Sequence, residues 1–348
     1  MTFCPIFGTD EFMDSSTSTS NSHELAHRKL QHIELAKSSQ TTAACLDERF
    51  YYEPIFFGHQ NLKSWPSSFL GTHLDFPLWV SSMTGGTELA HTINSNLSRL
   101  VGEYKLGMGL GSCRPLLESS DRLTDFNWRK NIGDQPYFAN LGIAQIEQLL
   151  DAGKTSLAHE LVKKIEATGL IIHINPLQEW FQPEGDKFKY SPLKTLQRFL
   201  ETSDYPVLVK EVGQGMGPRS LKALLDLPIA GIEFGAFGGT NFSLLENLRA
   251  KSQVHKEAFI NVGHTAQEMV GFINALGNHD KEIIISGGIK SGLDAYQLLK
   301  LSKTRSLVGM AYAFLAPASQ SYEALEIFYL SLRDSMLTAS ELLELKGE

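Results

Sequence analysis

The chain has 348 residues, of which 42% are hydrophobic and 20% are charged, and its formal net charge is −8. This length suits a single (β/α)8 barrel or two smaller domains. The negative charge argues against nucleic acid or an anionic membrane surface as a partner. No apolar run approaches the roughly 20 residues of a membrane span, and the first residues lack the features of a signal peptide. We therefore expect a cytoplasmic protein with no membrane partner.

The three cysteines, Cys4, Cys45 and Cys113, are far apart in the sequence and odd in number. They predict free thiols in a reducing compartment and not a disulfide framework.

The chain is expected to have three parts. Residues 1–24 predict a disordered tail, because Ser15–Ser22 is almost entirely Ser, Thr and Asn. We expect residues 25–73 to form a lid and lead-in segment, and residues 74–348 to form the barrel.

Two motifs stand at the start of the lead-in segment. His23-Glu24-Leu25-Ala26-His27 matches the H-E-x-x-H zinc pattern, but no third ligand is evident nearby, so we interpret it as a chance match. Arg28, Lys29 and His32 follow as a basic cluster. This cluster indicates either a solvated helix face or a lid that grips a phosphate, because arginine and lysine both bind such anions.

Apolar strands alternate with amphipathic stretches from residue 74 onward. The predicted strands are Pro77–Met83, Leu106–Gly111, Pro136–Leu141, Leu170–Asn175, Val207–Val212, Gly231–Ala236, Glu282–Ser286 and Leu307–Met310. Helical stretches between them include Leu89–Tyr104, Thr155–Thr168 and Asp294–Ser302. This alternation implies a parallel sheet, and eight units in about 240 residues predict a closed (β/α)8 TIM barrel. A doubly wound sheet is the competing fold, but the glycine spacing of a dinucleotide-binding turn is absent.

The fourth predicted strand carries an unusual polar load at its end. Side chains alternate along a strand, so His173 and Asn175 point to one side. Pro176 ends the strand, which places Gln178 and Glu179 in the loop beyond it. The segment is either a turn followed by a helix or part of a polar rim.

The other seven predicted strands also end in polar residues and glycines. In a barrel enzyme the active site is built at these carboxyl ends. Gly287-Gly288 and Gly309-Met310-Ala311 follow the last two strands, where such barrels cradle a phosphate with backbone N–H groups. Lys210 ends the fifth strand as a cation that needs a partner, and the reduced ring of a flavin fits that need.

Nine motifs together resemble type 2 isopentenyl diphosphate isomerase. They are Arg28-Lys29-x-x-His32, Ser-Ser-Met-Thr-Gly-Gly at 81–86, Gly-Ser-x-Arg at 111–114, Asn-Leu-Gly at 140–142, His-Ile-Asn-Pro-Leu-Gln-Glu at 173–179, Val-Lys-Glu-Val-Gly at 209–213, Gly-Gly-Thr-Asn at 238–241, Gly-Gly-Ile-Lys at 287–290 and Gly-Met-Ala at 309–311. Their order and spacing make the resemblance specific from about His27 to Leu315.

The resemblance implies an FMN-dependent barrel that interconverts isopentenyl diphosphate and dimethylallyl diphosphate. It also implies Mg²⁺, NADPH as the usual reductant, and a homo-oligomer (a tetramer or octamer). The implied FMN-binding residues are Ser82, Met83, Thr84, Ser112, Asn140, Lys210, Thr240, Gly287, Gly288, Lys290, Met310 and Ala311. The implied substrate-binding residues are Arg28, Lys29, His32, Ser112, Arg114, His173, Asn175 and Gln178. Glu179 would hold Mg²⁺.

The implied reaction moves a double bond by protonating one carbon and deprotonating another. Gln178, Lys210 and His173 are the expected catalytic residues, and Glu246 joins them because of its spacing after Thr240-Asn241. Cys113, Lys290 and Phe242 depart from the commoner residues of the family. Lys290 weakens any bidentate phosphate contact, since lysine lacks the fork of arginine.

Two rival functions remain open. An FMN-dependent 2-hydroxy-acid oxidase shares the barrel but needs a His–Arg pair late in it, and neither His255 nor His264 has an adjacent arginine. A catalytically silent barrel that serves as an assembly subunit is the other alternative, and eight polar strand ends argue against it.

Overall fold

The structure is a computed structural model that describes residues 16–56, 64–83, 85–249 and 257–347, with the backbone alone at 16–22. The chain divides into two units, Met1–Arg49 and Phe50–Glu348. The first contains α1 (Ser16–Leu35) and η1 (Ala43–Cys45), so its helix begins within the segment expected to be a disordered tail.

The second unit begins earlier than the predicted barrel boundary at residue 74. Strand β1 (Phe50–Tyr52) pairs antiparallel with β12 (Leu343–Leu345) near the end of the chain. This long-range pairing explains the difference, because it ties residues from Phe50 onward to the barrel unit.

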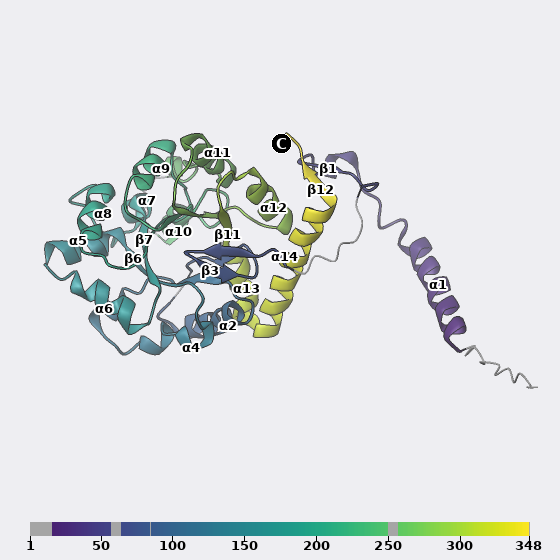
Figure 1. Ribbon diagram of the computed structural model, residues 1–348, viewed down its shortest axis with the longest axis horizontal. Helices are drawn as coiled ribbons and strands as arrows, with labels where there is room; N and C mark the ends of the chain where they lie inside the picture. The colour runs from purple at the N-terminus through teal and green to yellow at the C-terminus, as the bar shows by residue number, and fades with distance from the viewer. Residues whose placement is uncertain (1–15, 57–63, 84, 250–256, 348) are drawn as a thin grey trace, which may run out of the picture. The chain divides into compact units, whose positions relative to one another are not determined.

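The predicted (β/α)8 barrel is confirmed. Eight parallel strands close in the order β10-β11-β4-β5-β6-β7-β8-β9 (Figure 1). Their bounds are β4 (Leu78–Val80), β5 (Gly107–Gly109), β6 (Tyr137–Gly142), β7 (Gly169–Ile174), β8 (Val207–Glu211), β9 (Gly231–Glu233), β10 (Glu282–Ser286) and β11 (Ser306–Met310). Each lies within one residue of a predicted strand or inside it, since short β-branched runs between turn residues mark buried parallel strands.

Helices surround the barrel. They are α2 (Glu88–Glu103), α3 (Pro115–Glu118), α4 (Arg129–Ile132), α5 (Ile143–Asp151), α6 (Ser156–Lys164), α7 (Pro176–Phe181), α8 (Pro192–Leu200), α9 (Pro218–Leu225), α10 (Phe242–Arg249), α11 (Ala266–Leu276), α12 (Gly292–Leu301), α13 (Tyr312–Gln320) and α14 (Tyr322–Leu342), with short turns η2 (Leu123–Asp125) and η3 (Glu257–Phe259). Among the described helices, none is long and apolar enough to cross a membrane.

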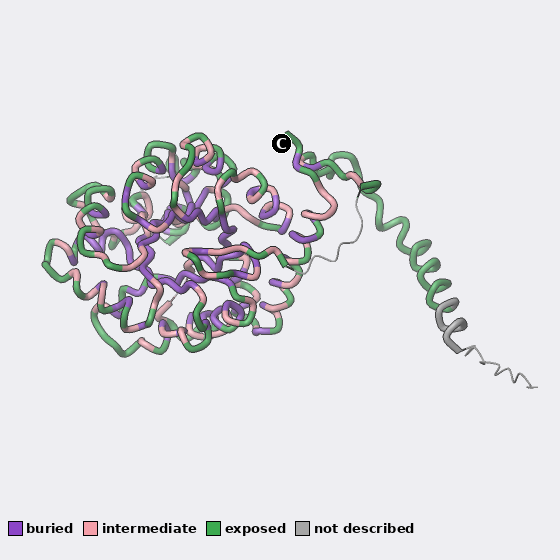
Figure 2. The backbone as a smooth tube through the Cα atoms, in the orientation of Figure 1, coloured by how far each residue is buried: buried purple, intermediate pink, exposed green. Residues whose placement is uncertain are grey.

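The period-2 alternation of the strands separates two cores. Residues such as Val80, Ile172 and Val209 point outward and pack against the helices. Their neighbours one position earlier, Trp79, Ile171 and Leu208, fill the barrel interior with Phe138, Ile284 and Leu307. Figure 2 shows these strands as the buried centre of the unit. Two residues after Trp79, Ile171 and Leu208, the same alternation points the side chains of Ser81, His173 and Lys210 inward. The barrel interior therefore becomes polar toward the carboxyl ends of the strands.

The amino-terminal end of the barrel is closed by the hairpin β2 (Ser67–Phe69) and β3 (Thr72–Leu74). Phe69 is fully buried against Trp79, with ring centroids 5.0 Å apart. The Leu70 N–H donates to Glu282, the first residue of β10, at 2.9 Å. With this end plugged, ligands enter the barrel from the carboxyl ends of the strands.

Candidate active site

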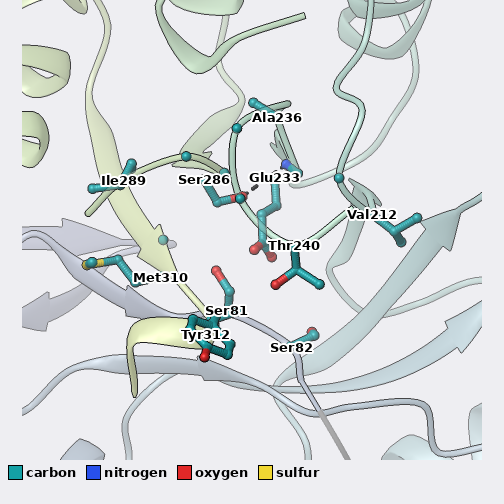
Figure 3. Close-up of a pocket in the computed structure, with 18 of the residues that line it drawn as sticks. Ser81, Ser82, Val212, Glu233, Ala236, Thr240, Ser286, Ile289, Met310 and Tyr312 are labelled. Carbon is teal, nitrogen blue, oxygen red and sulfur yellow. Dashed lines mark hydrogen bonds between the residues drawn. The ribbon is translucent and has the colours of Figure 1, made fainter. Parts of the chain in front are cut away.

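A cavity of about 510 Å³ lies at the carboxyl ends of β8, β9, β10, β11 and β4 (Figure 3). Its volume is within the range of roughly 300–1,000 Å³ that is typical of small-molecule sites. Its lining includes most residues predicted to bind FMN, namely Ser82, Lys210, Thr240, Gly287, Gly288, Lys290, Met310 and Ala311. Ser82 Oγ is buried there without a hydrogen-bond partner in the part of the chain that the structure describes.

The Gly238-Gly239 loop and the Gly287-Gly288 loop form one wall of this cavity. Gly287 and Gly288 adopt φ angles of 99° and 75°, which favour glycine. A Cβ at Gly287 would lie 2.1 Å from the carbonyl oxygen of Ala236, so the loop needs glycine here. Helix α13 follows β11 and begins at Tyr312, with no side-chain cap at Ala311. Backbone N–H groups at this end fit the phosphate of a mononucleotide such as FMN.

Lys210 lies near the centre of the polar layer. It is 8% exposed, and its Nζ donates to the carbonyl oxygen of Glu211 at 2.7 Å. Lys210 pairs in register with His173 on β7 and with Glu233 on β9. The lysine therefore joins the cavity to the polar end of β7.

His173 is held in one tautomer. Asn140 donates through Nδ2 to the Leu110 carbonyl at 2.9 Å, so its Oδ1 faces His173 Nδ1 at 2.7 Å and accepts that proton. The Nε2 atom is then the acceptor of a neutral ring. Burial and the nearby Lys210 charge lower the pKa of His173 from 6.5 to about 3. His173 thus offers a neutral base at the site and not a cation.

The carboxylate and amides after β7 are positioned by a helix. Asn175 occupies the N-cap position of α7 without a side-chain cap, and the helix begins at Pro176, so Gln178 and Glu179 lie in the first turns of α7. The prediction that they occupy a loop was wrong, because proline at the first helical position starts a helix as well as ending a strand. Asn175 Nδ2 donates to Gln178 Oε1 at 3.0 Å and to Glu179 Oε1 at 2.9 Å.

Helix α10 meets this cluster. Gln178 Nε2 lies 3.4 Å from Oε1 of Glu246, whose side chain is buried. Arg249, one turn further along α10, donates to the other Glu246 oxygen and also to Glu184 at 2.8 Å. The structure therefore links Gln178 to Glu246, although the two residues are far apart in the sequence.

Arg114 and Glu179 meet at Asp186, in the loop after α7. Arg114 lies 3.8 Å from the Asp186 carboxylate. Glu179 Oε2 accepts the Asp186 N–H at 2.7 Å. A cationic group and a carboxylate are thus held at one rim, which suits a diphosphate bound together with a divalent cation.

The other predicted residues lie apart from these contacts. Met83 is partly buried, and Ser112 is exposed, with its Oγ 3.4 Å from the Arg114 N–H. Arg28, Lys29 and His32 are exposed on α1 in the first unit. Thr84 lies outside the described residues. Within the described ranges, no group of three or more His, Cys, Asp and Glu side chains could hold a metal.

Curated relatives match most of the chain. An isopentenyl-diphosphate delta-isomerase of Deinococcus radiodurans is 35% identical over 86% of this chain and 88% of its own length. The isomerase of that name from Rickettsia rickettsii is 33% identical over 89% of this chain and 92% of its own. The chain belongs to the isopentenyl-diphosphate delta-isomerase family. No protein-family model matches it.

Solved structures agree on the fold of this family member. A mandelate oxidase variant with a monooxide FMN adduct aligns with a TM-score of 0.54 at 16% identity, over 86% of this chain and 88% of that one. A flavocytochrome b2 variant with benzoylformate aligns with a TM-score of 0.56 at 17% identity, over 86% and 76%. At this identity the likeness establishes the barrel.

Three site residues escaped prediction from the family motifs. Arg249 and Asp186 lie outside the family motifs, and their contacts with Glu184 and Arg114 join residues that are distant in sequence. Glu233 is different, because it stands inside the apolar strand Gly231–Ala236. A carboxylate there is a visible signal, since isolated charges are costly in a barrel interior.

Proposed function

We propose that this protein interconverts isopentenyl diphosphate and dimethylallyl diphosphate, with reduced FMN and Mg²⁺. The observation that carries the proposal is the pairing of Lys210 with His173, because it joins a cavity with a phosphate cradle to the network on α7. The names of the relatives supply the substrates. NADPH as the reductant and a homo-oligomeric assembly are part of the proposal through the family resemblance.

The reaction needs a strong acid, because an unactivated alkene is a weak base. When bound, reduced FMN supplies an electron-rich ring that donates a proton and stabilises the developing cation. Ser82, Thr240 and Lys210 would hold the ring, and the Gly287-Gly288 loop and the start of α13 would hold its phosphate. Lys210 would favour the anionic form of the reduced ring by its charge.

Gln178 and Glu246 would help the proton exchange. The amide faces the buried carboxylate at 3.4 Å, and Arg249 supports the charge of that carboxylate. His173, kept neutral by burial and by the Lys210 charge and held in one tautomer by Asn140, would offer Nε2 as a hydrogen-bond acceptor without adding a positive charge beside Lys210.

Glu179 would hold Mg²⁺ together with the diphosphate oxygens, since Mg²⁺ is often bound by one carboxylate plus substrate phosphates. Arg114, now facing Asp186 at 3.8 Å, supplies a guanidinium that a diphosphate can engage. Arg28, Lys29 and His32 are proposed to add cationic groups to the same ligand.

A 2-hydroxy-acid oxidase is the second candidate, favoured by the structural neighbours alone. The His264 backbone bonds to Gln214 and Phe237, and its ring packs edge-on against Phe272. None of these contacts involves an arginine, and His255 lies outside the described residues. The isomerase proposal accounts for more of the site.

The deciding assay incubates the purified protein with FMN, Mg²⁺ and isopentenyl diphosphate under nitrogen, with and without dithionite. We expect dimethylallyl diphosphate only when the flavin is reduced. A parallel reaction in air supplies lactate and mandelate as 2-hydroxy acids. Oxygen consumption there, with no isomerisation under nitrogen, would instead establish the oxidase.

A further inference from the structure

Glu233 is a fully buried acid in the lining of the cofactor cavity. It ends β9, is 0% exposed, and its carboxylate points into the cavity between Ser81 and Thr240 in the view of Figure 3. Neither of its oxygens has a hydrogen-bond partner in the described part of the chain. Native proteins rarely leave buried carboxyl oxygens without partners, so this group needs an explanation.

The polar groups around Glu233 do not satisfy it. Trp79 Nε1 and Ser81 Oγ are themselves buried without partners within the described residues. Ser286 Oγ accepts the Gly235 N–H at 3.0 Å, and its own O–H forms no hydrogen bond with Glu233. The charged form of Glu233 is favoured by three nearby side chains, those of Trp79, Ser81 and Ser286, but less than burial disfavours it. None of the three forms a hydrogen bond with the carboxylate.

Three charged side chains lie on the flanking strands, and none of them forms a hydrogen bond with Glu233. Lys210 on β8 is paired in register with Glu233, but its Nζ bonds to the Glu211 carbonyl. The Glu211 carboxylate is turned away, since it accepts the N–H groups of Gly213, Gln214 and Gly215. On β10, Glu282 pairs in register with Gly231, at the other end of β9 from Glu233. Its carboxylate lies 2.6 Å from the Arg305 guanidinium.

A carboxyl group in this setting is more stable with its proton. Moving an unpaired carboxylate out of water costs several kcal/mol, and such groups neutralise instead. Burial raises the pKa of Glu233, and the Lys210 charge opposes that rise only in part. Burial also raises the pKa of Glu211, but three backbone N–H donors oppose that rise, and Glu233 has no such donors among the described residues.

We propose that Glu233 is a neutral acid that donates a hydrogen bond from the cavity wall to a carbonyl or ring nitrogen of the bound heteroaromatic ring. The ligand part rests on the proposed flavin. A neutral donor orients the ring without cancelling the positive charge of Lys210. That charge remains available to the reduced ring. Carboxylic acids kept neutral by an apolar site can serve as hydrogen-bond donors in this way.

The protonation state can be measured without any ligand. Infrared spectra of the flavin-free protein at pH 8 should contain the carbonyl stretch of a protonated carboxylic acid. That band should vanish in Glu233→Gln and persist in Glu344→Gln, a matched change on an exposed strand. A spectrum of the wild-type protein without this band would overturn the proposal, even if the Gln variant fails to fold.

Flavin binding tests the donor role. Glu233→Gln keeps an N–H donor and the neutral charge, so the Kd for oxidised and reduced FMN should stay within about threefold of wild type. Glu233→Met removes the donor and should weaken both by about tenfold. If Glu233 were ionised, Glu233→Gln would tighten anionic reduced FMN by about tenfold or more, which would contradict the proposal.

The two proposals can fail separately. A protein that binds no FMN would remove the flavin assignment, while the infrared band would still decide the state of Glu233. A protein that binds FMN but lacks the band would keep the flavin and remove the neutral acid.

Discussion

Lys210 and His173 lie side by side at the ends of β8 and β7, and different groups hold them. Lys210 is anchored by a backbone carbonyl, which leaves its charge for a ligand. His173 is anchored by the Asn140 side chain, which fixes its tautomer, and burial and the Lys210 charge keep the ring neutral. Both side chains were predictable, because the period-2 alternation of a buried strand fixes which residues face the interior. The Asn140 partner of His173 was not predictable in this way, since it comes from the neighbouring strand β6.

Replacing Lys210 by methionine keeps most of its volume and removes its charge. We expect turnover to fall by about 100-fold or more, because electrostatic groups of this kind contribute that much to catalysis. The reduced flavin should also lose its anionic absorbance spectrum. Lys210→Arg should restore little, since a planar fork cannot replace the single bond from Nζ to the Glu211 carbonyl.

The matched control is Lys222→Met, which removes an exposed lysine on α9 that pairs with Asp226. Its turnover and reduced-flavin spectrum should match wild type. A Lys210→Met enzyme with the same two properties would show that the lysine is structural.

His173 predicts a pH dependence of stability. Its pKa in the folded protein is about 3, below the ordinary value of 6.5, so the unfolded chain binds the proton first. The free energy of unfolding should therefore be highest above about pH 6.5 and should fall as the pH drops toward 3. In His173→Gln this acid-side loss should be shallower, measured as urea midpoints between pH 7 and 4.

His73→Gln is the control for that series, because His73 is an exposed residue of β3. It should keep the wild-type slope. Equal slopes in wild type and His173→Gln would mean that the ring is protonated in the folded protein.

Helices α7 and α10 show where sequence patterns stop being informative. The apolar runs predicted all eight strands, and proline and glycine marked where they end. The helix that carries Gln178 and Glu179 was predicted as a loop, because the same Asn-Pro pair suits both. Glu246 was found only through its spacing after a family motif. Its contact with Gln178 depends on how the two helices pack, and no local pattern encodes that.

Arg249→Met should disturb the link between these helices. The buried Glu246 would lose its cationic partner, so turnover should fall by roughly 10- to 100-fold. KM for isopentenyl diphosphate should change little, because Arg249 acts through Glu246 in this account. Arg249→Lys should recover part of the loss, since lysine keeps the charge.

Arg333→Met provides the comparison, as Arg333 pairs with the exposed Asp334 on α14. It should leave kcat and KM unchanged. An Arg249→Met enzyme in which only KM rises would place the arginine in substrate binding instead.

Glu179→Gln should abolish the Mg²⁺ requirement together with nearly all turnover. The amide keeps the shape of the side chain and its bond from Asn175, but it loses the charge that holds the ion. FMN binding should be unchanged, since Glu179 is not part of the cofactor cavity lining. Mg²⁺ titrations of activity in both proteins test this. A normal Mg²⁺ curve in the variant would place the metal elsewhere.

At the scale of the whole molecule, the chain combines a barrel unit with a first unit that carries α1. Arg28→Ala should raise KM for isopentenyl diphosphate by roughly 10- to 100-fold, because a charged hydrogen bond to phosphate is lost. FMN binding and barrel stability should not change. Lys37→Ala, an exposed lysine just after α1, should leave KM at the wild-type value. Equal KM values in low salt for Arg28→Ala and wild type would make the basic cluster a solvated helix face.

We propose that this barrel with one polar rim moves protons and produces no net oxidation. The most direct test runs the reaction under nitrogen in D₂O with reduced FMN, Mg²⁺ and isopentenyl diphosphate. We predict that solvent deuterium enters dimethylallyl diphosphate and that the absorbance of reduced flavin is the same after many turnovers. Product without solvent deuterium, or flavin oxidised in proportion to product, would contradict the account.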